Sequence, residues 1–202
     1  IKLGFIFNLY YCYFIQKQIK QDKVIKSNSI LSLSHSIVCS LTGLIHLISN
    51  KNFLYYTKYY SIGYLLVDLL SINILEELKK GNKLYNFHHV MFIITWLFLN
   101  IENVEIAYYL SRALLFELSV IPLNLRLLSK YYFSKYTDLL SFITYITFFL
   151  CRIVNLLEIY LNNYHIISKF YIMYYSFIPL QCYWFTLMTI KVYKNYIKKK
   201  IL

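Results

Sequence analysis

The stretch LYNFHHVMFIITWLFLN, residues 84–100, begins with two adjacent histidines and continues as an almost wholly apolar run. A membrane-spanning helix needs about 20 predominantly apolar residues, because each residue advances it by about 1.5 Å through a hydrocarbon layer about 30 Å thick. Similar runs recur along the chain and are separated by short polar or charged breaks. We identify seven of them, at residues 3–15, 29–49, 59–78, 84–100, 104–125, 138–161 and 167–190.

The composition favours the same architecture. Hydrophobic residues make up 59% of the 202 residues and charged residues only 15%, whereas soluble domains carry about 25% charged residues. Four glycines and two prolines leave little material for the many tight turns of a β-rich fold. The sequence therefore predicts an all-α protein, a polytopic transmembrane helical bundle of about seven helices.

The net charge of +12 is informative through its distribution. If successive breaks lie on alternate sides of a membrane, one side receives Lys2, Lys51, Lys58 and Lys169. The other side receives Lys17, Lys20, Lys23, Lys26, Lys79, Lys80, Lys83, Arg126, Lys130, Lys135, Lys191, Lys194, Lys198, Lys199 and Lys200. Cytoplasmic loops carry the excess of Lys and Arg, so the N-terminus is predicted outside and the C-terminus on the positive-inside side. Topology explains the basic charge, and no nucleic-acid partner is expected.

Three segments are expected along the chain. Residues 1–28 hold a first transmembrane helix and a basic loop, residues 29–193 a six-helix bundle, and residues 194–202 a basic C-terminal tail. The first run is short and the chain opens on Ile1, so this run is either the remainder of a longer helix or an end left by processing. Buried free thiols, without a zinc site, are expected at the four cysteines, which fall in apolar runs at unrelated spacings: Cys12, Cys39, Cys151 and Cys182.

Polar side chains inside the runs indicate a site, because a charge in a bilayer is costly unless it is paired or lines a polar cavity. Arg112 and Arg152 are expected to find carboxylate or carbonyl partners. At about 1.5 Å per residue, five runs bring polar groups into the half of the bilayer on the basic side, and Arg152 lies beyond the midplane, about 20 Å from that side. We expect a polar cavity that opens toward the basic side, with the candidate residues His35, Asp68, His88, His89, Glu117, Asn124, Arg152 and Gln181.

The two adjacent histidines admit several interpretations. Neighbouring residues of a helix point about 100° apart, so His88 and His89 reach one small site only with the help of other helices. No metal site is expected, because His35 and His46 lie about 16 Å apart on their helix and no His-Glu-x-x-His motif occurs. The pair is then either interfacial, with hydrogen bonds to a loop or a lipid headgroup, or it binds a ligand or takes part in catalysis.

The carboxylates raise a similar choice, since a carboxylate at mid-bilayer needs a partner or a proton. Asp68 is either a hydrogen-bonded strut between helices or a carboxylic acid kept neutral by desolvation. Glu117 and Asn124 lie seven residues apart and share a helix face, and Pro122 between them removes a backbone hydrogen bond. Such a kink either presents polar groups to a cavity or is repaired by them.

Six short motifs follow one another through most of the chain. They are SLSHSIVCSLTG (32–43), SIGYLLVDLL (61–70), FHHVMFIITW (87–96), FELSVIPLNLRLL (116–128), FFLCRIVNL (148–156) and LQCYWFTLM (180–188). No single motif is specific. Their order and spacing over residues 30–195, however, resemble the TLC-domain family, which includes ceramide synthases and translocating-chain-associating membrane proteins.

The resemblance implies a bundle whose central cavity opens toward the cytosol-like side and holds a lipid or an acyl chain. It places the eight candidate residues at positions that the family tends to keep. In the ceramide-synthase branch, paired histidines and a downstream His-Asp element are linked to acyl transfer from acyl-CoA to a sphingoid amine. Here His88 and His89 form the pair, but the next histidine is His165, and the Glu117 region stands in place of His-Asp. The chain therefore resembles the non-synthase branch more closely.

Three functions follow as hypotheses. The first is a non-enzymatic protein that binds or senses membrane lipid and contributes to lipid homeostasis, with the headgroup near Lys83, His88 and His89. The second is an accessory subunit that docks on other membrane-protein subunits. The third is an N-acyltransferase with acyl-CoA as cosubstrate, His88 or His89 as base and Glu117 assisting; the first two need no cofactor, and the missing His-Asp element favours them. The family resemblance suggests the endoplasmic reticulum, and the alternative is the mitochondrial inner membrane.

Overall fold

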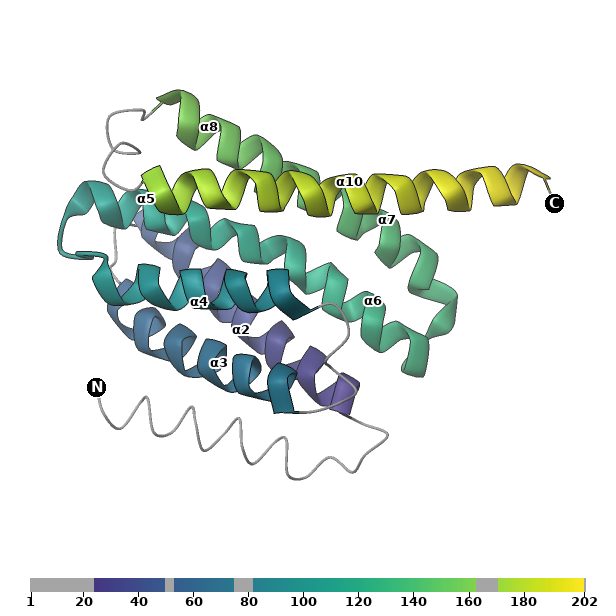
Figure 1. The fold of residues 1–202 in the computed structure, drawn as a ribbon, viewed down its shortest axis with the longest axis horizontal. Coiled ribbons are helices and arrows are strands. Elements are labelled where there is room, and N and C mark those ends of the chain that lie inside the picture. Colours follow the sequence, from purple (N-terminus) through teal and green to yellow (C-terminus); the bar gives the residue numbers. More distant parts are fainter. Residues whose placement is uncertain (1–23, 50–52, 75–81, 163–170, 202) are drawn as a thin grey trace.

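The computed structural model describes residues 24–49, 53–74, 82–162 and 171–201 (Figure 1). Every regular element among these residues is helical, which confirms the predicted all-α fold. The elements are α2 (Val24–Ser49), α3 (Leu54–Ile74), α4 (Asn82–Phe98), α5 (Val104–Leu114), η3 (Leu115–Ser119), α6 (Val120–Tyr132), η4 (Ser134–Tyr136), α7 (Thr137–Phe148), η5 (Phe149–Val154), α8 (Asn155–Asn162) and α10 (Tyr171–Ile201).

The six runs predicted after residue 28 each correspond to one helix or to one composite helix. Segments α5, η3 and α6 follow one another without a break, as do α7, η5 and α8 (Figure 1). Helix α10 continues to Ile201, so the basic residues at the end of the chain prolong it. The predicted first span, residues 3–15, lies outside the described residues, as do Cys12 and His165.

Three helices among the described residues are long and apolar enough to cross a membrane, at residues 28–49, 104–132 and 134–161. Large apolar side chains also cover the outside of the bundle; Ile48, Phe98 and Val104 are each more than 80% exposed. In water such a surface would favour aggregation, whereas in a bilayer it contacts lipid. The chain is therefore an integral membrane protein with an all-α fold.

The cysteines differ from one another in burial. Cys39, Cys151 and Cys182 are all free thiols. Cys39 is buried as predicted and Cys151 is half-buried. The prediction of a buried thiol is wrong for Cys182, which lies on the exposed face of α10, where an apolar thiol contacts lipid instead of protein.

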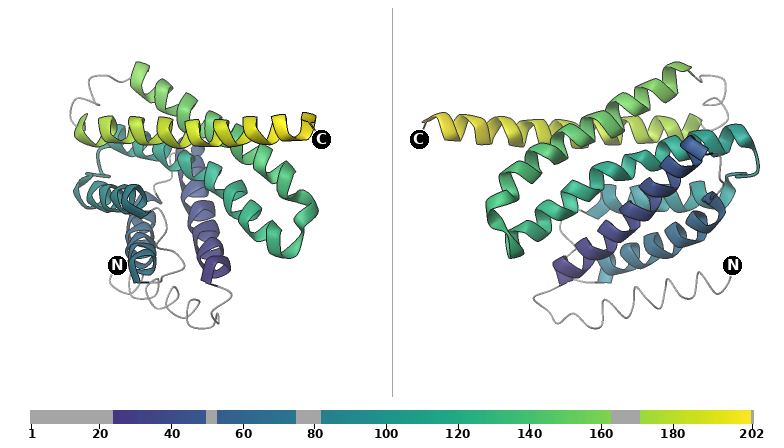
Figure 2. Two further views of the ribbon diagram at one scale, coloured as in Figure 1. Left: turned by 45° about the vertical axis from the view of Figure 1, so that its right-hand side comes forward. Right: turned by 180° about the vertical axis from the view of Figure 1, so that it is seen from behind.

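Helix α2 is the centre of the bundle. It packs against α3, α5, η3 and α6, while α10 lies across α4, α7 and η5 (Figure 2). Small residues of α2 allow this close approach, since a Cβ atom at Gly43 would lie 2.7 Å from the carbonyl oxygen of Ser111 and 3.1 Å from Cβ of Leu114. Small residues at helix contacts let backbones approach within a membrane, where the hydrophobic effect does not drive helices together.

Two irregular turns interrupt the composite helices where the predicted site residues occur. The segment η3 is a 3₁₀ turn that ends three residues before Pro122, and Pro122 cannot donate a hydrogen bond to the carbonyl of Leu118. The segment η5 is a π-helical turn that contains Arg152. Single π turns within α-helices occur frequently at functional sites.

We expect Gly43→Ala to destabilise the bundle by about 1–3 kcal/mol, because the added methyl group must push α2 away from the backbone of α5. Unfolding in mild detergent, followed by circular dichroism, measures this loss. Leu41→Ala is the control, since Leu41 is half exposed on α2. Equal stability of Gly43→Ala and the wild type would contradict the close contact.

Candidate functional site

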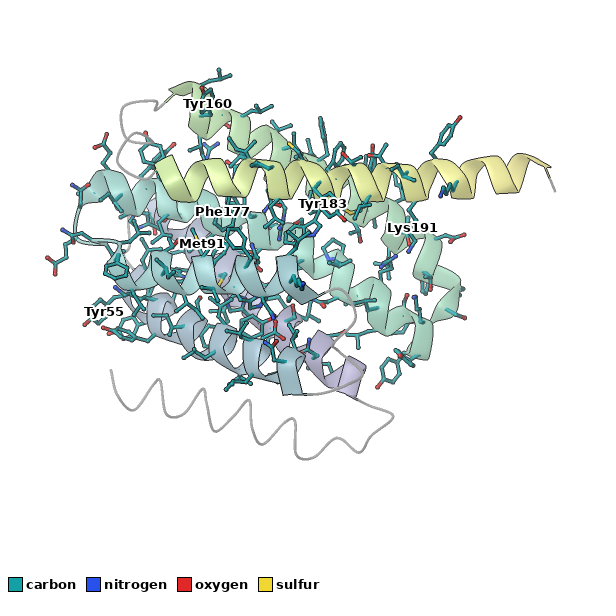
Figure 3. All side chains as sticks on the ribbon, in the orientation of Figure 1. Tyr55, Met91, Tyr160, Phe177, Tyr183 and Lys191 are labelled. Carbon is teal, nitrogen blue, oxygen red and sulfur yellow. The ribbon has the colours of Figure 1, made fainter. Side chains whose placement is uncertain are left out.

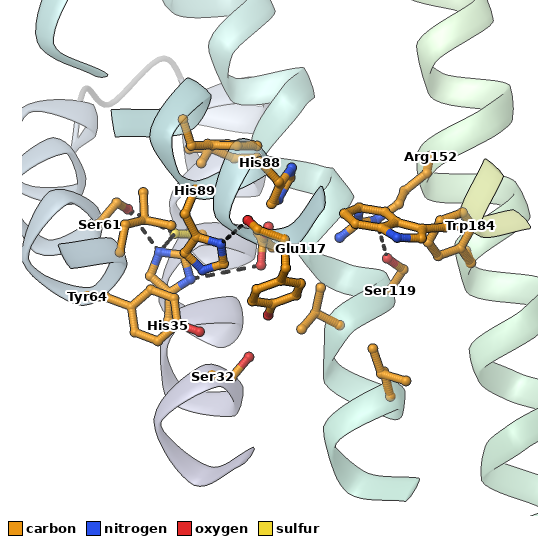
Figure 4. Close-up of a pocket in the computed structure, with 18 of the residues that line it drawn as sticks. Ser32, His35, Ser61, Tyr64, His88, His89, Glu117, Ser119, Arg152 and Trp184 are labelled. Atoms are coloured by element: carbon orange, nitrogen blue, oxygen red, sulfur yellow. Dashed lines mark hydrogen bonds and ion pairs between the residues drawn. The ribbon is translucent and has the colours of Figure 1, made fainter. Parts of the chain in front are cut away.

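A cavity of about 360 Å³ lies inside the bundle, enclosed by residues of α2, α3, α4, α5, η3, α6, α7, η5 and α10 (Figure 4). Most of its wall is apolar, with Leu65, Phe92, Trp96, Leu114, Val120, Leu123, Phe148, Trp184, Leu187 and Met188. The polar groups of its lining belong to Ser32, His35, Ser61, Tyr64, Tyr85, His88, His89, Glu117, Ser119 and Arg152. The cavity therefore joins an apolar chamber to a set of convergent polar groups.

The structure brings together all eight residues that the sequence singled out. Five of them line the cavity: His35, His88, His89, Glu117 and Arg152. The other three lie behind the wall and hydrogen-bond to residues that line it: Asp68, Asn124 and Gln181. They come from α2, α3, α4, η3, α6, η5 and α10, so only the packing of these helices assembles the set.

His89 is held at both ring nitrogens. Its Nε2 lies 2.7 Å from Oδ2 of Asp68, and its Nδ1 lies 2.9 Å from the carbonyl oxygen of Tyr85. A carbonyl oxygen only accepts, so Nδ1 must donate to it. The Asp68 contact then contains one further proton, carried either by an imidazolium or by the carboxylic acid. Both residues are about 2% exposed, so this pair is a buried strut between α3 and α4, of which His89 lines the cavity.

His88 occupies a different environment, as the angle between neighbouring helical residues predicts. Its ring lies 4.8 Å from that of Phe92, 5.4 Å from that of Phe177 and 5.3 Å from that of Trp184. The buried Nδ1 atom has no hydrogen-bond partner among the described residues. His88 therefore presents an imidazole from an aromatic cage, and its nitrogen is free to meet a ligand in the cavity.

His35 anchors a cluster on the side of α2 and α3. Its Nε2 lies 3.2 Å from Oγ of Ser61 and 3.3 Å from Sγ of Cys39, and its ring stacks on Tyr64 with centroids 4.0 Å apart. Its Nδ1 lies 3.9 Å from Oε2 of Glu117. No group of three His, Cys, Asp or Glu side chains suited to a metal occurs among the described residues.

Glu117 and Asn124 both attach the kinked helix to α2. Ser36 donates to Oε2 of Glu117 at 3.1 Å, and Asn124 donates through Nδ2 to Oγ of Ser32 at 2.9 Å. On α2 the donor Ser36 and the acceptor Ser32 lie four residues, or about one turn, apart. Glu117 remains on the cavity wall, whereas Asn124 is used as a connection between helices.

Arg152 closes the opposite wall. Its Nε donates to Oγ of Ser119 at 2.8 Å and to the carbonyl of Phe116 at 3.3 Å, and its Nη1 donates to Oε1 of Gln181 at 3.0 Å. No carboxylate of the described residues lies within ion-pair distance of it. The guanidinium is only 5% exposed, so a buried cation balanced by neutral acceptors faces the chamber.

Arg112 does not belong to the cavity. Its Nε donates to Oδ1 of Asn155 at 3.0 Å, and its Nη2 forms an ion pair with the half-exposed carboxylate of Glu158. The expected carboxylate partner of an arginine inside a span is thus found here, between α5 and α8. The pair fastens the two composite helices at a distance from the polar groups of the chamber.

Several residues of the site were not singled out from the sequence. Ser32, Ser36 and Ser40 recur at intervals of four on the buried face of α2, and this spacing is a signal of helix contact that the sequence contains. Tyr64 and Tyr85 carry no such signal, because tyrosine is frequent throughout the chain. Only the tertiary structure separates them from the other tyrosines.

These features define a multipass helical membrane protein with a largely apolar chamber at its centre that carries a few convergent polar groups. The model of the TLC domain, TRAM_LAG1_CLN8, matches residues 26–201, which is most of the chain. The chain therefore belongs to the TLC-domain family, as its motifs predicted. Comparisons with curated proteins and with solved structures found no match.

Asp68→Leu and His89→Leu should each lower stability by about 3–5 kcal/mol, because each leaves the other partner buried without its charge or hydrogen bond. The double variant should be less destabilised than the sum of the two single variants, since it removes both polar groups together. Denaturant unfolding of the four proteins in detergent measures this coupling. Strict additivity would show that the two side chains do not interact.

The two arginines inside the spans should differ in their contribution to stability. Arg152→Met removes the donor to Ser119 and Gln181, leaves the carbonyl of Phe116 with the Ser119 hydroxyl as its remaining side-chain donor, and should cost about 3 kcal/mol. Arg112→Met breaks a partly exposed ion pair and should cost about 1 kcal/mol or less. The melting temperatures of the two variants test this order, and a larger loss for Arg112→Met would contradict it.

Proposed function

We propose that this protein binds a membrane lipid, with an acyl chain in its central cavity, and acts as a non-enzymatic lipid-binding or lipid-sensing member of the TLC-domain family. One observation carries the proposal: the bundle is not filled by its own side chains but leaves a chamber of about 360 Å³ with largely apolar walls. Ligand sites are typically such concave, mostly apolar chambers with a few placed polar groups. Regulation of membrane lipid composition is the role we assign to this binding.

The position of the polar groups supports an amphipathic ligand. Leu65, Trp96 and Leu114 offer contacts to a hydrocarbon chain, and His88 and Arg152 offer a free imidazole and a cation to a polar group. Lys83, which the sequence suggested as a headgroup contact, does not line the chamber. An amphipathic lipid that lays its acyl chain along the apolar wall and brings polar atoms near His88 or Arg152 satisfies both kinds of surface.

The geometry of the histidine pair favours binding over acyl transfer. A general base needs a nitrogen lone pair within reach of the nucleophile. Both nitrogens of His89 are engaged, by Asp68 and by Tyr85. Of the two adjacent histidines, His88 alone has a nitrogen without a partner among the described residues, so the acyltransferase alternative depends on His88 and on acyl-CoA as cosubstrate.

An accessory role within a larger membrane assembly is compatible with lipid binding. A gentle purification that retains both lipids and partner proteins shows which of the two accompanies the protein. We place the protein in the endoplasmic reticulum on the basis of its family, with the mitochondrial inner membrane as the alternative.

Native mass spectrometry of the gently purified protein tests the proposal. We expect one lipid per chain on the wild type and a loss of at least tenfold in its occupancy in Val120→Trp, because the indole fills the chamber that Val120 lines. Val154→Trp is the matched control, since Val154 is exposed on the outside of η5.

Four outcomes would contradict the proposal. A wild type without bound lipid would mean that the chamber is not a lipid site. A lipid lost equally from both tryptophan variants would place it on the outer surface. Turnover of labelled acyl-CoA that His88→Gln abolishes would assign the chamber to acyl transfer. Co-purification of a constant set of membrane proteins without lipid would assign an accessory role to the protein.

A further inference from the structure

A second cavity, of about 210 Å³, lies between α6, α7 and α10. Its wall carries two cations, Arg126 on α6 and Lys191 on α10, and no acidic residue. Neither cation forms an ion pair with a carboxylate of the described residues, and the buried Nε of Arg126 has no hydrogen-bond partner among them. Asp138, near the start of α7, is not part of the wall.

The serine and threonine hydroxyl groups of this cavity do not compete for a ligand as donors, whereas the phenol of Tyr145, which accepts from Thr189, adds a neutral donor to the wall. Ser141 donates to the carbonyl of Thr137 at 2.7 Å, and Thr144 donates to that of Leu140 at 2.6 Å. Both protons thus remain within α7. The guanidinium of Arg126 and the ammonium of Lys191 are the charged donors of the wall, and charge-assisted hydrogen bonds from such groups select phosphate and carboxylate oxygens.

The second cavity is adjacent to the central one. Leu123, Leu187 and Met188 line both, and all three are apolar. Figure 3 shows Lys191 on α10 close to α7, and α10 packs against α7. The charge distribution of the sequence predicts that Arg126 and Lys191 lie on the side of the membrane that receives most of the basic residues, where lipid phosphates meet juxtamembrane cations.

The geometry points to a headgroup site: Arg126 and Lys191 bind the phosphate of an anionic bilayer lipid whose acyl chain passes Leu123, Leu187 and Met188 into the central cavity. This inference rests on the proposed lipid binding and adds the chemical class of the ligand. It also assigns the headgroup to residues that are remote from the histidine pair in sequence and separate from the eight candidate residues.

The test compares two lipids with identical chains, dioleoylphosphatidylglycerol and dioleoylphosphatidylcholine, titrated against the full chain in detergent and followed by native mass spectrometry. The wild type should prefer the anionic lipid. In Arg126→Gln/Lys191→Gln its affinity should fall about 25-fold, since each cation near a headgroup contributes about fivefold. The affinity for phosphatidylcholine should fall less, because its own choline cation offsets the charge of its phosphate.

The control variant is Lys130→Gln/Lys135→Gln. It removes the same charge from α6 and η4 at residues that do not line the cavity, and it should change neither affinity by more than about twofold. Equal affinity of the wild type for the two lipids, or an equal loss of affinity for phosphatidylglycerol in the control variant, would overturn the headgroup site. The proposed function would remain intact in either case as long as phosphatidylcholine binds. Failure of both lipids to bind would overturn the proposed function as well.

Inorganic phosphate separates the two sources of the anion. Millimolar phosphate should leave phosphatidylglycerol bound, because the acyl chain contributes to the affinity for the lipid. Displacement of the lipid by phosphate alone would assign the cavity to a soluble anion and overturn the lipid assignment.

Discussion

The hydrogen bonds of Arg152 are the interaction on which the rest of this bundle depends. A guanidinium is always charged, and the interior of a bilayer supplies no water to solvate it. It is satisfied by the carbonyl of Phe116, by Ser119 and by Gln181, which belong to two other helices. These contacts join the 3₁₀ turn η3, the π turn η5 and the helix α10, and the chamber lies beside this junction.

The same requirement explains the other polar contacts of the core. Asp68 and His89 share a proton between α3 and α4, and Glu117 and Asn124 bind serines of α2. Each contact satisfies a group that would otherwise be buried in hydrocarbon without a partner, which is costly. A rearrangement of these helices would break hydrogen bonds between buried polar groups. The chamber is therefore expected to be preformed rather than induced by a ligand.

The apolar wall and the polar groups suit one kind of ligand together. An apolar chamber alone suits a hydrocarbon, and a buried cation alone suits an anion. Their combination, with the two cations Arg126 and Lys191 of the adjacent cavity between α6, α7 and α10, suits an amphipathic molecule. The histidine pair takes part in this arrangement unequally, since His89 supports the fold and His88 faces the chamber.

The sequence by itself determined the all-α membrane fold, because apolar runs of spanning length admit no other satisfied backbone in a bilayer. It also identified the eight polar residues, because each is costly within a span. Only the tertiary structure decided which of them share hydrogen bonds and which face a chamber, and it alone separated Arg152 from Arg112. Partner choice depends on the rotation and tilt of helices, which are set by contacts such as the approach of α5 to Gly43 and not by the local pattern of residues.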